Sequence, residues 1–303
     1  MSNLYLLIVC FVLGLVFKRI SAFPVNTPKV ISSFIMYVSL PALVLYHVHE
    51  LKLSGEIVFL ALMPWIVFFI GFVVFYTLFK LKKLNYKIAI CLVLTAGLGN
   101  TSFVGFPLLE FYLGKESLGY AIIADQLGTF LVLSFPGIIL ATTAEEGKWS
   151  FSFLLKRVVG FVPIYALVLA LLLRPIEYGE HLKILLQRLG DTLTPLALVS
   201  VGFLLDIKKI KGFEKIIFYG LFYKLVLSPF LLFLLFRPFG LSDLIFKTII
   251  LEAGMAPMVT SSIVAIDKDI EPELAALMLG IGIPISFFST AIISYLLNLN
   301  FGN

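Results

Sequence analysis

Apolar stretches constrain the fold of this chain more than any other feature of its sequence. Ten of them follow one another, separated by short polar or charged segments, and all but a shorter first one approach the roughly 20 residues that a membrane-spanning helix needs. They cover residues 4–17, 28–46, 57–79, 88–113, 118–141, 153–173, 185–205, 216–236, 244–266 and 274–297. The sequence therefore predicts an all-α polytopic membrane protein with ten transmembrane helices.

Composition supports this class and excludes others. Hydrophobic residues make up 60% of the chain and charged residues 14%, whereas soluble domains carry about 25% charged residues. The net charge of +5 comes from basic residues scattered between the apolar stretches. We interpret them as topology signals, and we expect no nucleic-acid partner.

Cysteine and histidine give no sign of a metal site. Cys10 and Cys91 both lie within apolar stretches, as buried thiols do. His47 and His49 are two residues apart, so a helix points them in different directions, and His181 is distant in sequence. We predict that the chain holds no metal and no cofactor.

The fourth apolar stretch is broken in its middle. Gly97, Gly99, Asn100, Gly105 and Pro107 fall within about three helical turns. Glycine and proline both disfavour a helix interior, and a membrane offers no water to the backbone groups that a break frees. Such a break persists where protein surrounds it or where it lines a polar cavity, and transporters build substrate sites on broken helices. The alternative is a proline-kinked helix without a ligand.

The ninth stretch is broken in a similar way by residues 254–257, which end at Pro257. The sequence distance from Pro41 to Pro107 is close to that from Pro195 to Pro257. This spacing predicts two five-helix repeats, residues 1–143 and 148–303. Because each repeat has an odd number of helices, the repeats are inverted, and the broken fourth and ninth helices should cross near the bilayer centre.

Loop charges predict the orientation. Lys18 and Arg19 follow the first stretch, and further lysines gather in the segments 80–87 and 208–215. These positions alternate with loops that carry fewer basic residues, so the positive-inside rule places both termini outside. We expect a multi-pass protein of the cytoplasmic membrane.

Three motifs in the fourth, eighth and ninth stretches carry a resemblance to a known family. They are Asn100-Thr101 followed by Gly105 and Pro107, Lys224-Leu225 with Pro229, and residues 252–257 with Thr260. They resemble the auxin efflux carrier family, which includes the plant PIN-type exporters and prokaryotic permeases. The resemblance spans essentially the whole chain. It implies two inverted five-helix repeats with crossed broken helices, a fold shared with bile acid sodium symporters, and transport of organic anions such as malate, malonate or indole-acetate.

Residues at the two breaks are the candidates for substrate binding. We expect half-helices to begin after Pro107 and Pro257, and the start of a half-helix carries partial positive charge and unsatisfied N–H groups, which favour a carboxylate. Side-chain amide and hydroxyl groups can add hydrogen bonds, although serine and threonine often bond back to their own helix. The candidates are Asn100, Thr101, Gly105, Pro107, Pro257, Thr260 and Ser261.

Ionisable residues inside apolar helices are the candidates for proton or charge coupling. Each costs roughly 2.5–3.5 kcal/mol at a helix centre, so it needs a partner or a function. The candidates are Asp125, Glu252 and Lys224. The structural alternatives are pairing of Lys224 with Asp191 or Asp125, of Glu252 with Lys247, and of Asp191 with Arg188.

Together these features predict a secondary transporter or permease that moves a small organic anion by alternating access around a midplane site. Its partners are the anion and the lipid bilayer. Proton coupling, sodium coupling and a homodimer all stay open. A sodium-coupled symporter of the bile acid type is one alternative. An intramembrane aspartyl protease using Asp125 and Asp191 is another, but it leaves the paired breaks unexplained.

Overall fold

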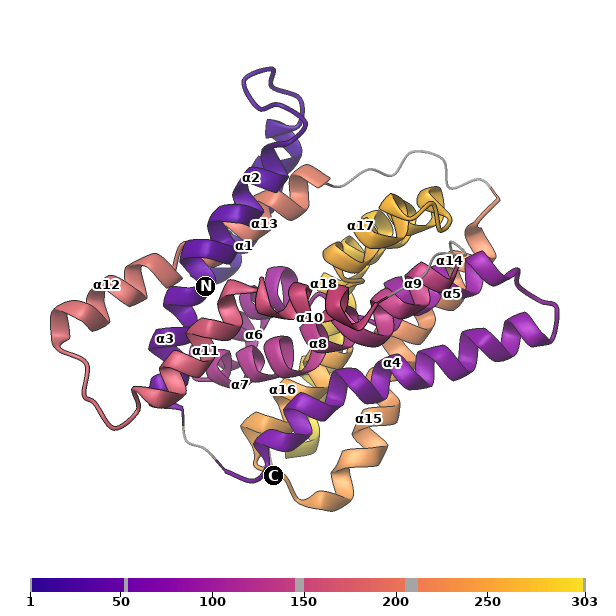
Figure 1. Ribbon diagram of the computed structural model, residues 1–303. Coiled ribbons are helices and arrows are strands. Elements are labelled where there is room, and N and C mark those ends of the chain that lie inside the picture. The colour runs from indigo at the N-terminus through magenta and orange to yellow at the C-terminus, as the bar shows by residue number, and fades with distance from the viewer. Residues whose placement is uncertain (1, 52–53, 145–149, 205–211, 302–303) are drawn as a thin grey trace. The chain divides into compact units, whose positions relative to one another are not determined.

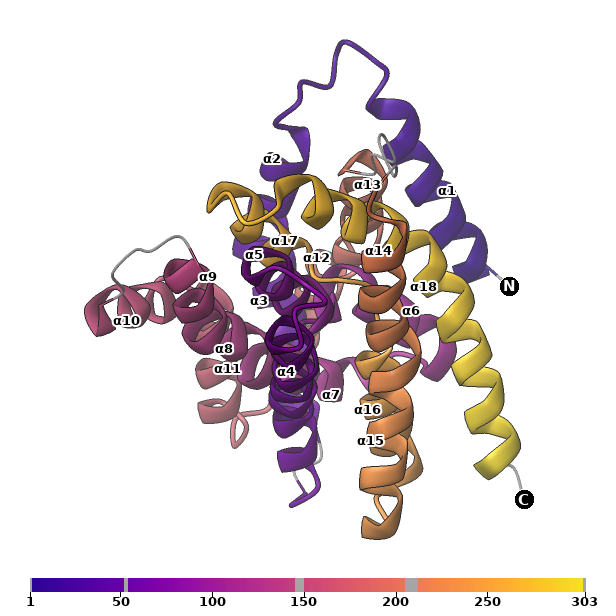
Figure 2. The same cartoon turned by 90° about the vertical axis from the view of Figure 1, so that its right-hand side faces the viewer.

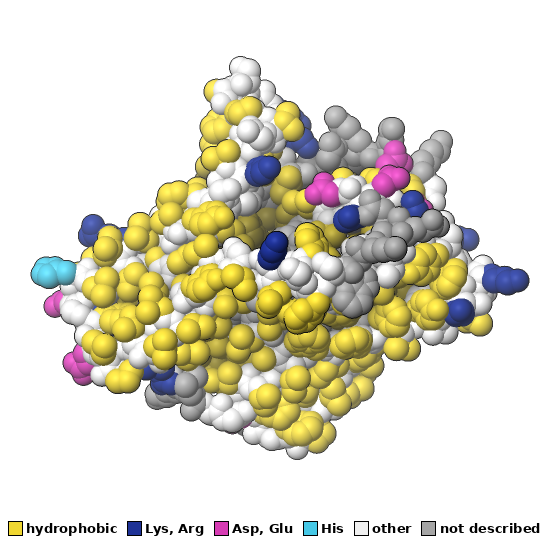
Figure 3. Space-filling model, in the orientation of Figure 1, with side chains coloured by type: hydrophobic (Ala, Val, Ile, Leu, Met, Phe, Trp, Pro, Cys, Tyr) yellow, Lys and Arg dark blue, Asp and Glu magenta, His cyan; other side chains and the backbone are white. Residues whose placement is uncertain are grey.

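The computed structural model describes residues 2–51, 54–144, 150–204 and 212–301 (Figure 1). Within these ranges every regular element is a helix, and the β pairing consists of one isolated bridge. In this described part of the chain, six helices are long and apolar enough to cross a membrane: Thr27–His49, Ile57–Lys80, Ser117–Ala144, Glu180–Leu204, Glu214–Phe239 and Pro272–Leu299. Hydrophobic side chains are spread over the face drawn in Figure 3, and charged side chains lie mainly toward its margins. These features support a polytopic membrane protein.

Shorter apolar helices occupy much of the rest of the predicted spans. They are Tyr5–Phe17, Tyr86–Ala96, Thr101–Leu113 and Val162–Leu172. The predicted sixth stretch, residues 153–173, differs from expectation because it forms two helices that meet at Gly160. Glycine disfavours a helix interior and Pro163 favours a first helical turn, so the chain restarts there.

The contacts divide the chain into two compact units. The first combines Met1–Ser54, Ser102–Ile122 and Val159–Leu205, and the second combines Gly55–Thr101, Ile123–Val158 and Asp206–Asn303. Each unit draws segments from both predicted repeats. The repeat boundaries and the count of ten transmembrane helices stay predictions.

The first unit packs through small residues. Gly14 on α1 and Gly202 on α13 lie where these two helices cross, and a Cβ atom at either would collide with backbone of the partner helix. Glycine thus allows the two backbones to approach closely, as it does in many membrane-helix pairs. The unit's helices are α1 (Ser2–Phe17), α2 (Thr27–Phe34), η1 (Ile35–Ser39), α3 (Leu40–Glu50), α6 (Phe106–Leu113), most of α7 (Ser117–Ile123), α11 (Val162–Leu172), α12 (Glu180–Gly190) and α13 (Leu193–Leu204).

The second unit contains both predicted breaks. Its helices are α4 (Ile57–Lys80), α5 (Tyr86–Ala96), η3 (Ala124–Thr129), α8 (Phe130–Val132), η4 (Leu133–Gly137), α9 (Ile138–Ala144), α10 (Phe151–Val159, whose last residue falls in the first unit), α14 (Glu214–Phe222), η5 (Tyr223–Leu227), α15 (Ser228–Phe236), η6 (Arg237–Phe239), α16 (Asp243–Ala253), α17 (Val259–Asp267) and α18 (Pro272–Phe301). The remaining helix, η2 (Thr101–Gly105), begins at the boundary between the units.

Packing in the second unit brings α4 against η3, and α15 against α16. Gly128 in η3 fits against the ring of Pro64 in α4, where a Cβ atom would collide with the proline. The hydroxyl of Tyr223 donates a hydrogen bond to the carbonyl of Val67, which lies one turn along α4 from Pro64. Figure 2 shows α14 and α15 as one continuous rod beside α16. This rod carries Lys224 past the second break.

Proline explains three π-helical turns in the chain. The turns η1, η2 and η5 end two residues before Pro41, Pro107 and Pro229, respectively. A proline ring clashes with the carbonyl four residues back and has no N–H to donate. A widened turn in front of the proline accommodates both changes without ending the helix. Proline thus marks a local change of helix type at these positions, and the helix continues.

Two loop contacts within the second unit each join two segments that are expected, from the loop charges, to lie on the same side of the membrane. Glu56 accepts hydrogen bonds from the backbone and hydroxyl of Ser242, at 2.9 and 2.7 Å, and both loops are expected outside. Lys87 donates a 3.2 Å hydrogen bond to the carbonyl of Asp269, and both loops are expected inside. The expected basic loop 208–215 lies largely outside the described residues, as does Asn303 at the C-terminus.

Candidate functional site

The two breaks meet in the second unit. Helix α5 ends at Ala96, and α16 ends at Ala253. Beyond these ends the chain leaves the helix, and Gly99 pairs with Pro257 in an antiparallel bridge. The amide of Asn100 donates a 2.8 Å hydrogen bond to the carbonyl of Ala256. The backbones at the two breaks are therefore in direct contact.

A second backbone hydrogen bond completes the pairing. The amide of Met258 donates to the carbonyl of Leu98 over 3.2 Å. Backbone groups freed inside a membrane have no water to bond, so each break supplies the partners that the other needs. Gly282 on α18 leaves room for Pro257, since a Cβ atom there would collide with the proline ring. The crossing is thus a packed and hydrogen-bonded feature of the fold.

A buried lysine stabilises the end of α16 next to this crossing. Lys224, which is 1% exposed, donates a 2.9 Å hydrogen bond from its ammonium to the carbonyl of Ala253, and the Ser228 hydroxyl lies 2.8 Å from the same oxygen. Carbonyl groups at a helix C-terminus lack helical partners and carry partial negative charge. A Cβ atom at Gly99 would lie only 2.8 Å from the ammonium nitrogen, so glycine gives the lysine its place.

Glu252 supplies a buried carboxylate beside the same helix end. The residue is fully buried, and neither of its carboxylate oxygens has a hydrogen-bond partner among the described residues. Lys224 and Asp125 both lie close enough to act on its charge, with opposite signs. An isolated buried carboxylate is unfavourable, so Glu252 depends on the ammonium, on a proton or on a bound group.

Asp125 on η3 completes the charged cluster. The hydroxyl of Thr101, the first residue of η2, donates a 2.6 Å hydrogen bond to its carboxylate. The next residue, Gln126, is fully buried, and both of its amide atoms lack partners within the described structure. One turn on, the buried Thr129 hydroxyl likewise has no partner in this part of the chain. The fifth helix therefore carries polar atoms with unused hydrogen-bonding capacity close to Asp125.

Comparison with known proteins identifies the family. The sequence matches the family described as "Membrane transport protein" over residues 1–294. The chain belongs to this membrane transport protein family. The match confirms the resemblance to auxin efflux carriers.

Two archaeal relatives of the family cover most of the chain. One, an uncharacterized transporter of Methanothermobacter thermautotrophicus, is 25% identical over 278 residues, which are 89% of either chain. The other, an uncharacterized transporter of Methanocaldococcus jannaschii, is 24% identical over 268 residues, or 82% of either chain. The chain is therefore similar to transporters along most of its length, and the family and these relatives are not described as enzymes.

The first break of this family member lies earlier than expected. The sequence predicted a half-helix that starts after Pro107, but the helix resumes at Thr101 and runs through Gly105 and Pro107 without interruption. The π-turn η2 accommodates the proline, so Pro107 no longer marks a helix start. Gly105 and Pro107 fall in the first unit, whereas Asn100 and Thr101 fall in the second.

Hydroxyl groups after the second break are mostly engaged with their own helix. Ser261 and Ser262 both donate to the carbonyl of Met258, at 3.1 and 2.9 Å. Thr260 is exposed. The structure therefore bears out back-bonding for the serines and turns Thr260 away from the buried cluster. The signal that sequence reasoning underused was Gln126, with Thr129 three residues later, in an apolar helix.

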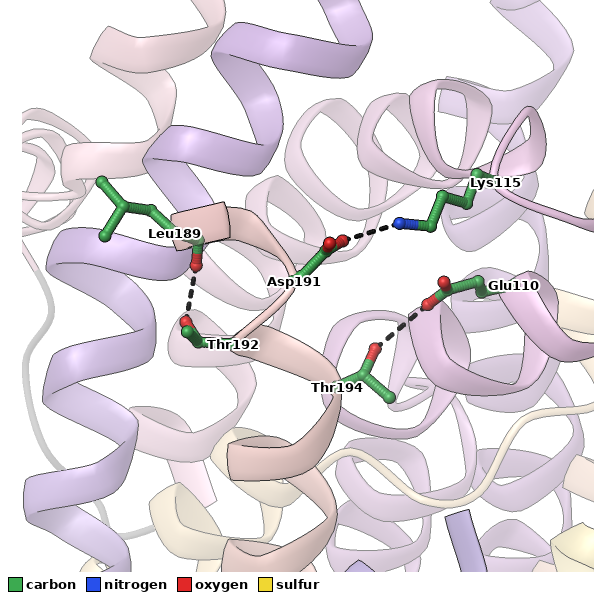
Figure 4. Close-up of polar contacts among 6 residues, drawn as sticks. All are labelled: Glu110, Lys115, Leu189, Asp191, Thr192 and Thr194. Atoms are coloured by element: carbon green, nitrogen blue, oxygen red, sulfur yellow. Dashed lines mark hydrogen bonds and ion pairs between the residues drawn. The ribbon is translucent and has the colours of Figure 1, made fainter. Parts of the chain in front are cut away.

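Three charged residues of the first unit, Glu110, Lys115 and Asp191, have partners outside the cluster (Figure 4). In the first unit, Lys115 forms a 2.8 Å ion pair with Asp191, and Thr194 donates a 3.3 Å hydrogen bond to Glu110. Asp191 thus pairs with Lys115 and not with Arg188, contrary to one sequence-based alternative. Loop residue Lys115 reaches it because Asp191 lies beyond the end of α12, where the helix no longer directs its side chain.

In the second unit, Lys247 forms a 2.8 Å ion pair with Asp243, one turn back along α16. The predicted alternative, pairing of Lys247 with Glu252, is wrong. A spacing of four residues aligns side chains on a helix face, whereas five residues do not.

Proposed function

We propose that the chain is a secondary transporter of a small organic anion, a carboxylate such as malate, malonate or an auxin-like acid, in the cytoplasmic membrane. The crossing of the two breaks carries this proposal. It places two helix interruptions, a buried cation and two buried carboxylates in one unit. A membrane protein tolerates this density of polar groups in apolar helices where they bind or move a solute.

Substrate recognition is assigned to the arms of the crossing. Asn100 and Thr101 lie at the first break, and the residues after Pro257 begin α17. The start of α17 offers backbone N–H groups and partial positive charge to a carboxylate. Gly105, Pro107, Thr260 and Ser261 shape the arms, with Ser261 acting through the backbone that it bonds.

Charge coupling is assigned to Asp125, Glu252 and Lys224. Moving one carboxylate through the membrane potential involves about 2.3 kcal/mol per 100 mV. A proton carried on Asp125 or Glu252 offsets that charge, whereas a sodium ion does so in the alternative sodium-coupled mechanism. Alternating access requires two inverted repeats, residues 1–143 and 148–303, that expose the crossing to either side with both termini outside.

The rival protease mechanism is weaker. It requires two carboxyl groups that share one water, yet Asp191 is ion-paired to Lys115 and Asp125 accepts a hydrogen bond from Thr101. Each carboxylate is thus held by its own partner.

The test is solute uptake by the purified full chain in liposomes. A thermal-shift screen of mono- and dicarboxylates first identifies the strongest ligand, and radiolabelled uptake of that acid is then measured. Imposed pH and sodium gradients separate proton coupling from sodium coupling.

We expect saturable uptake that the pH gradient accelerates in the wild type and not in Asp125→Asn. Absence of uptake for every acid that binds would overturn the transport proposal. Acceleration of uptake by a sodium gradient alone would show that the coupling ion is sodium and not a proton.

A further inference from the structure

A groove in the first unit lies on a surface with no role in the proposed transport site. It has a volume of about 250 Å³ and lies between the α2–η1 helix and the segment that begins α11. Lys29, Ser32, Met36 and Tyr37 line it from the first of these elements. Phe161 and Val162 line it from the second. Small-molecule sites are usually about 300–1,000 Å³, so this hollow suits a headgroup-sized ligand.

One end of the groove is polar and positively charged. Lys29 is exposed, and its ammonium forms no hydrogen bond or ion pair within the described chain. The Ser32 hydroxyl, one turn further on, likewise makes no hydrogen bond to a described residue. The neighbouring Ser33 is engaged, since its hydroxyl donates to the Lys29 carbonyl over 2.9 Å. An ammonium beside a hydroxyl donor is a combination that recognises phosphate oxygens.

The other end of the groove is apolar. Met36, Tyr37, Phe161 and Val162 form its walls, and Tyr37 is 65% exposed. Lys29 lies in the first turn of the Thr27–His49 span, and Tyr37 lies eight residues further along it. At 1.5 Å per residue the groove follows the helix for about 12 Å, from the water boundary into the region of acyl chains. A free anion would leave the apolar walls unused.

The charge of this end of the helix indicates which leaflet supplies the ligand. The segments that precede the groove residues are basic, with Lys18 and Arg19 before Lys29, and Lys156 and Arg157 in α10 before Gly160, and they are expected on the cytosolic side. Anionic headgroups give that leaflet a negative surface, to which basic residues near the membrane are attracted. We propose that the groove binds an anionic phospholipid, with its phosphate on Lys29 and Ser32 and the upper part of an acyl chain against Met36, Tyr37 and Phe161.

The experiment titrates the purified full chain with phosphatidylglycerol, with phosphatidylcholine of the same acyl chains and with glycerol phosphate. Bound lipids are counted by native mass spectrometry, and thermal stability is followed in parallel. We expect phosphatidylglycerol to bind more tightly than phosphatidylcholine, and glycerol phosphate to protect little. Lys29→Gln removes one basic charge near the membrane surface, so it should weaken phosphatidylglycerol binding about fivefold.

Two further variants make the result specific. Lys83→Gln removes the same charge from an exposed loop of the second unit that is also expected inside, and it should leave the lipid titration unchanged. Ser32→Phe keeps the charge but fills the groove, and it should weaken binding even if Lys29→Gln proves poorly stable. Equal binding of the two lipids, full protection by glycerol phosphate, or equal effects of Lys29→Gln and Lys83→Gln would each overturn the proposal.

Discussion

The ammonium of Lys224 donates a 2.9 Å hydrogen bond to the carbonyl of Ala253, the last residue of α16. This contact places the lysine Nζ where the second broken helix ends. The adjacent Glu252 carboxylate is buried and has no hydrogen-bond partner among the described residues. The lysine therefore serves two groups at once, a helix end through a hydrogen bond and a carboxylate through its charge.

The first prediction tests this double role. Lys224→Met should destabilise the protein by roughly 3–5 kcal/mol, because it leaves a buried carboxylate uncompensated. Glu252→Gln should cost less, and the double variant should recover part of the loss caused by Lys224→Met. Chemical denaturation in detergent measures all three, and the double-mutant cycle gives the coupling. Additive effects would show that the two charges do not interact.

The second prediction concerns the space beside the lysine. Gly99→Ala should destabilise the protein by about 1–3 kcal/mol, because the added Cβ atom would lie 2.8 Å from the lysine nitrogen at the crossing. Gly55→Ala is the matched control, since nothing lies within 4 Å of a Cβ atom there. Thermal unfolding of both variants should separate them clearly. Equal melting temperatures would mean that the structure around Gly99 accommodates the added methyl group without loss of stability.

A third prediction concerns substrate affinity. Asn100→Ala should weaken binding of the best acid about tenfold or more, since a hydrogen bond to a charged group contributes about 1.5–3 kcal/mol. The backbone hydrogen bond from residue 100 to Ala256 does not involve the side chain and should persist. Ser262→Ala serves as the control, because that hydroxyl bonds its own helix. Ligand titration by thermal shift measures the change, and unchanged affinity with normal expression would restrict Asn100 to a structural role.

A fourth prediction concerns pH and the loop contact between Glu56 and Ser242. Hydrogen bonds from the hydroxyl and then the backbone of Ser242 lower the pKa of Glu56 below its usual 4.5. A lowered folded-state pKa means that the contribution to stability is present above pH about 4.5 and is lost as the pH falls through the folded-state pKa. Wild type should therefore exceed Glu56→Gln in melting temperature at pH 7, and the difference should shrink as the pH falls below 4.5. A difference that is constant with pH would contradict the assignment.

The fifth prediction concerns orientation. A cysteine at Glu116 should react with an impermeant external reagent in intact cells, and a cysteine at Lys83 should not, because their loops are expected on opposite sides. Both positions are exposed, whereas the native Cys10 and Cys91 are buried and should give little background. The reverse labelling pattern would invert the topology.

Sequence reasoning located the breaks because glycine and proline act locally. Gly97, Gly99 and Pro257 disfavour a helix wherever they lie, and the membrane requires their freed backbone groups to find partners. The matched spacing of the two halves suggested that the breaks meet, and their backbones are hydrogen-bonded to each other. The sequence did not predict that the helix after the first break starts at Thr101. A π-turn in front of Pro107 is one of several ways in which a helix can accommodate a proline.

The contacts of the charged residues were harder to predict. Lys224 donates a hydrogen bond to a backbone carbonyl. Because every residue has a backbone carbonyl, the residue types in the sequence do not indicate which one Lys224 contacts. Thr260 is exposed although the adjacent Ser261 is buried, which depends on how α17 is rotated about its axis. Rotation and backbone approach are set by packing between distant segments, and a single sequence does not display them.

The contact between the two breaks also has a consequence for membrane insertion during synthesis. The amide of Asn100 bonds Ala256, and the carbonyl of Leu98 accepts from Met258, so the broken fourth segment finds its partners only in the last fifth of the chain. A ribosome delivers residues 97–100 to the membrane long before residues 254–258 exist. Until then the first break must be sheltered by the insertion machinery or held near water. Truncation before the ninth segment should therefore leave an inserted product that quality-control proteases degrade, even though every earlier span is intact.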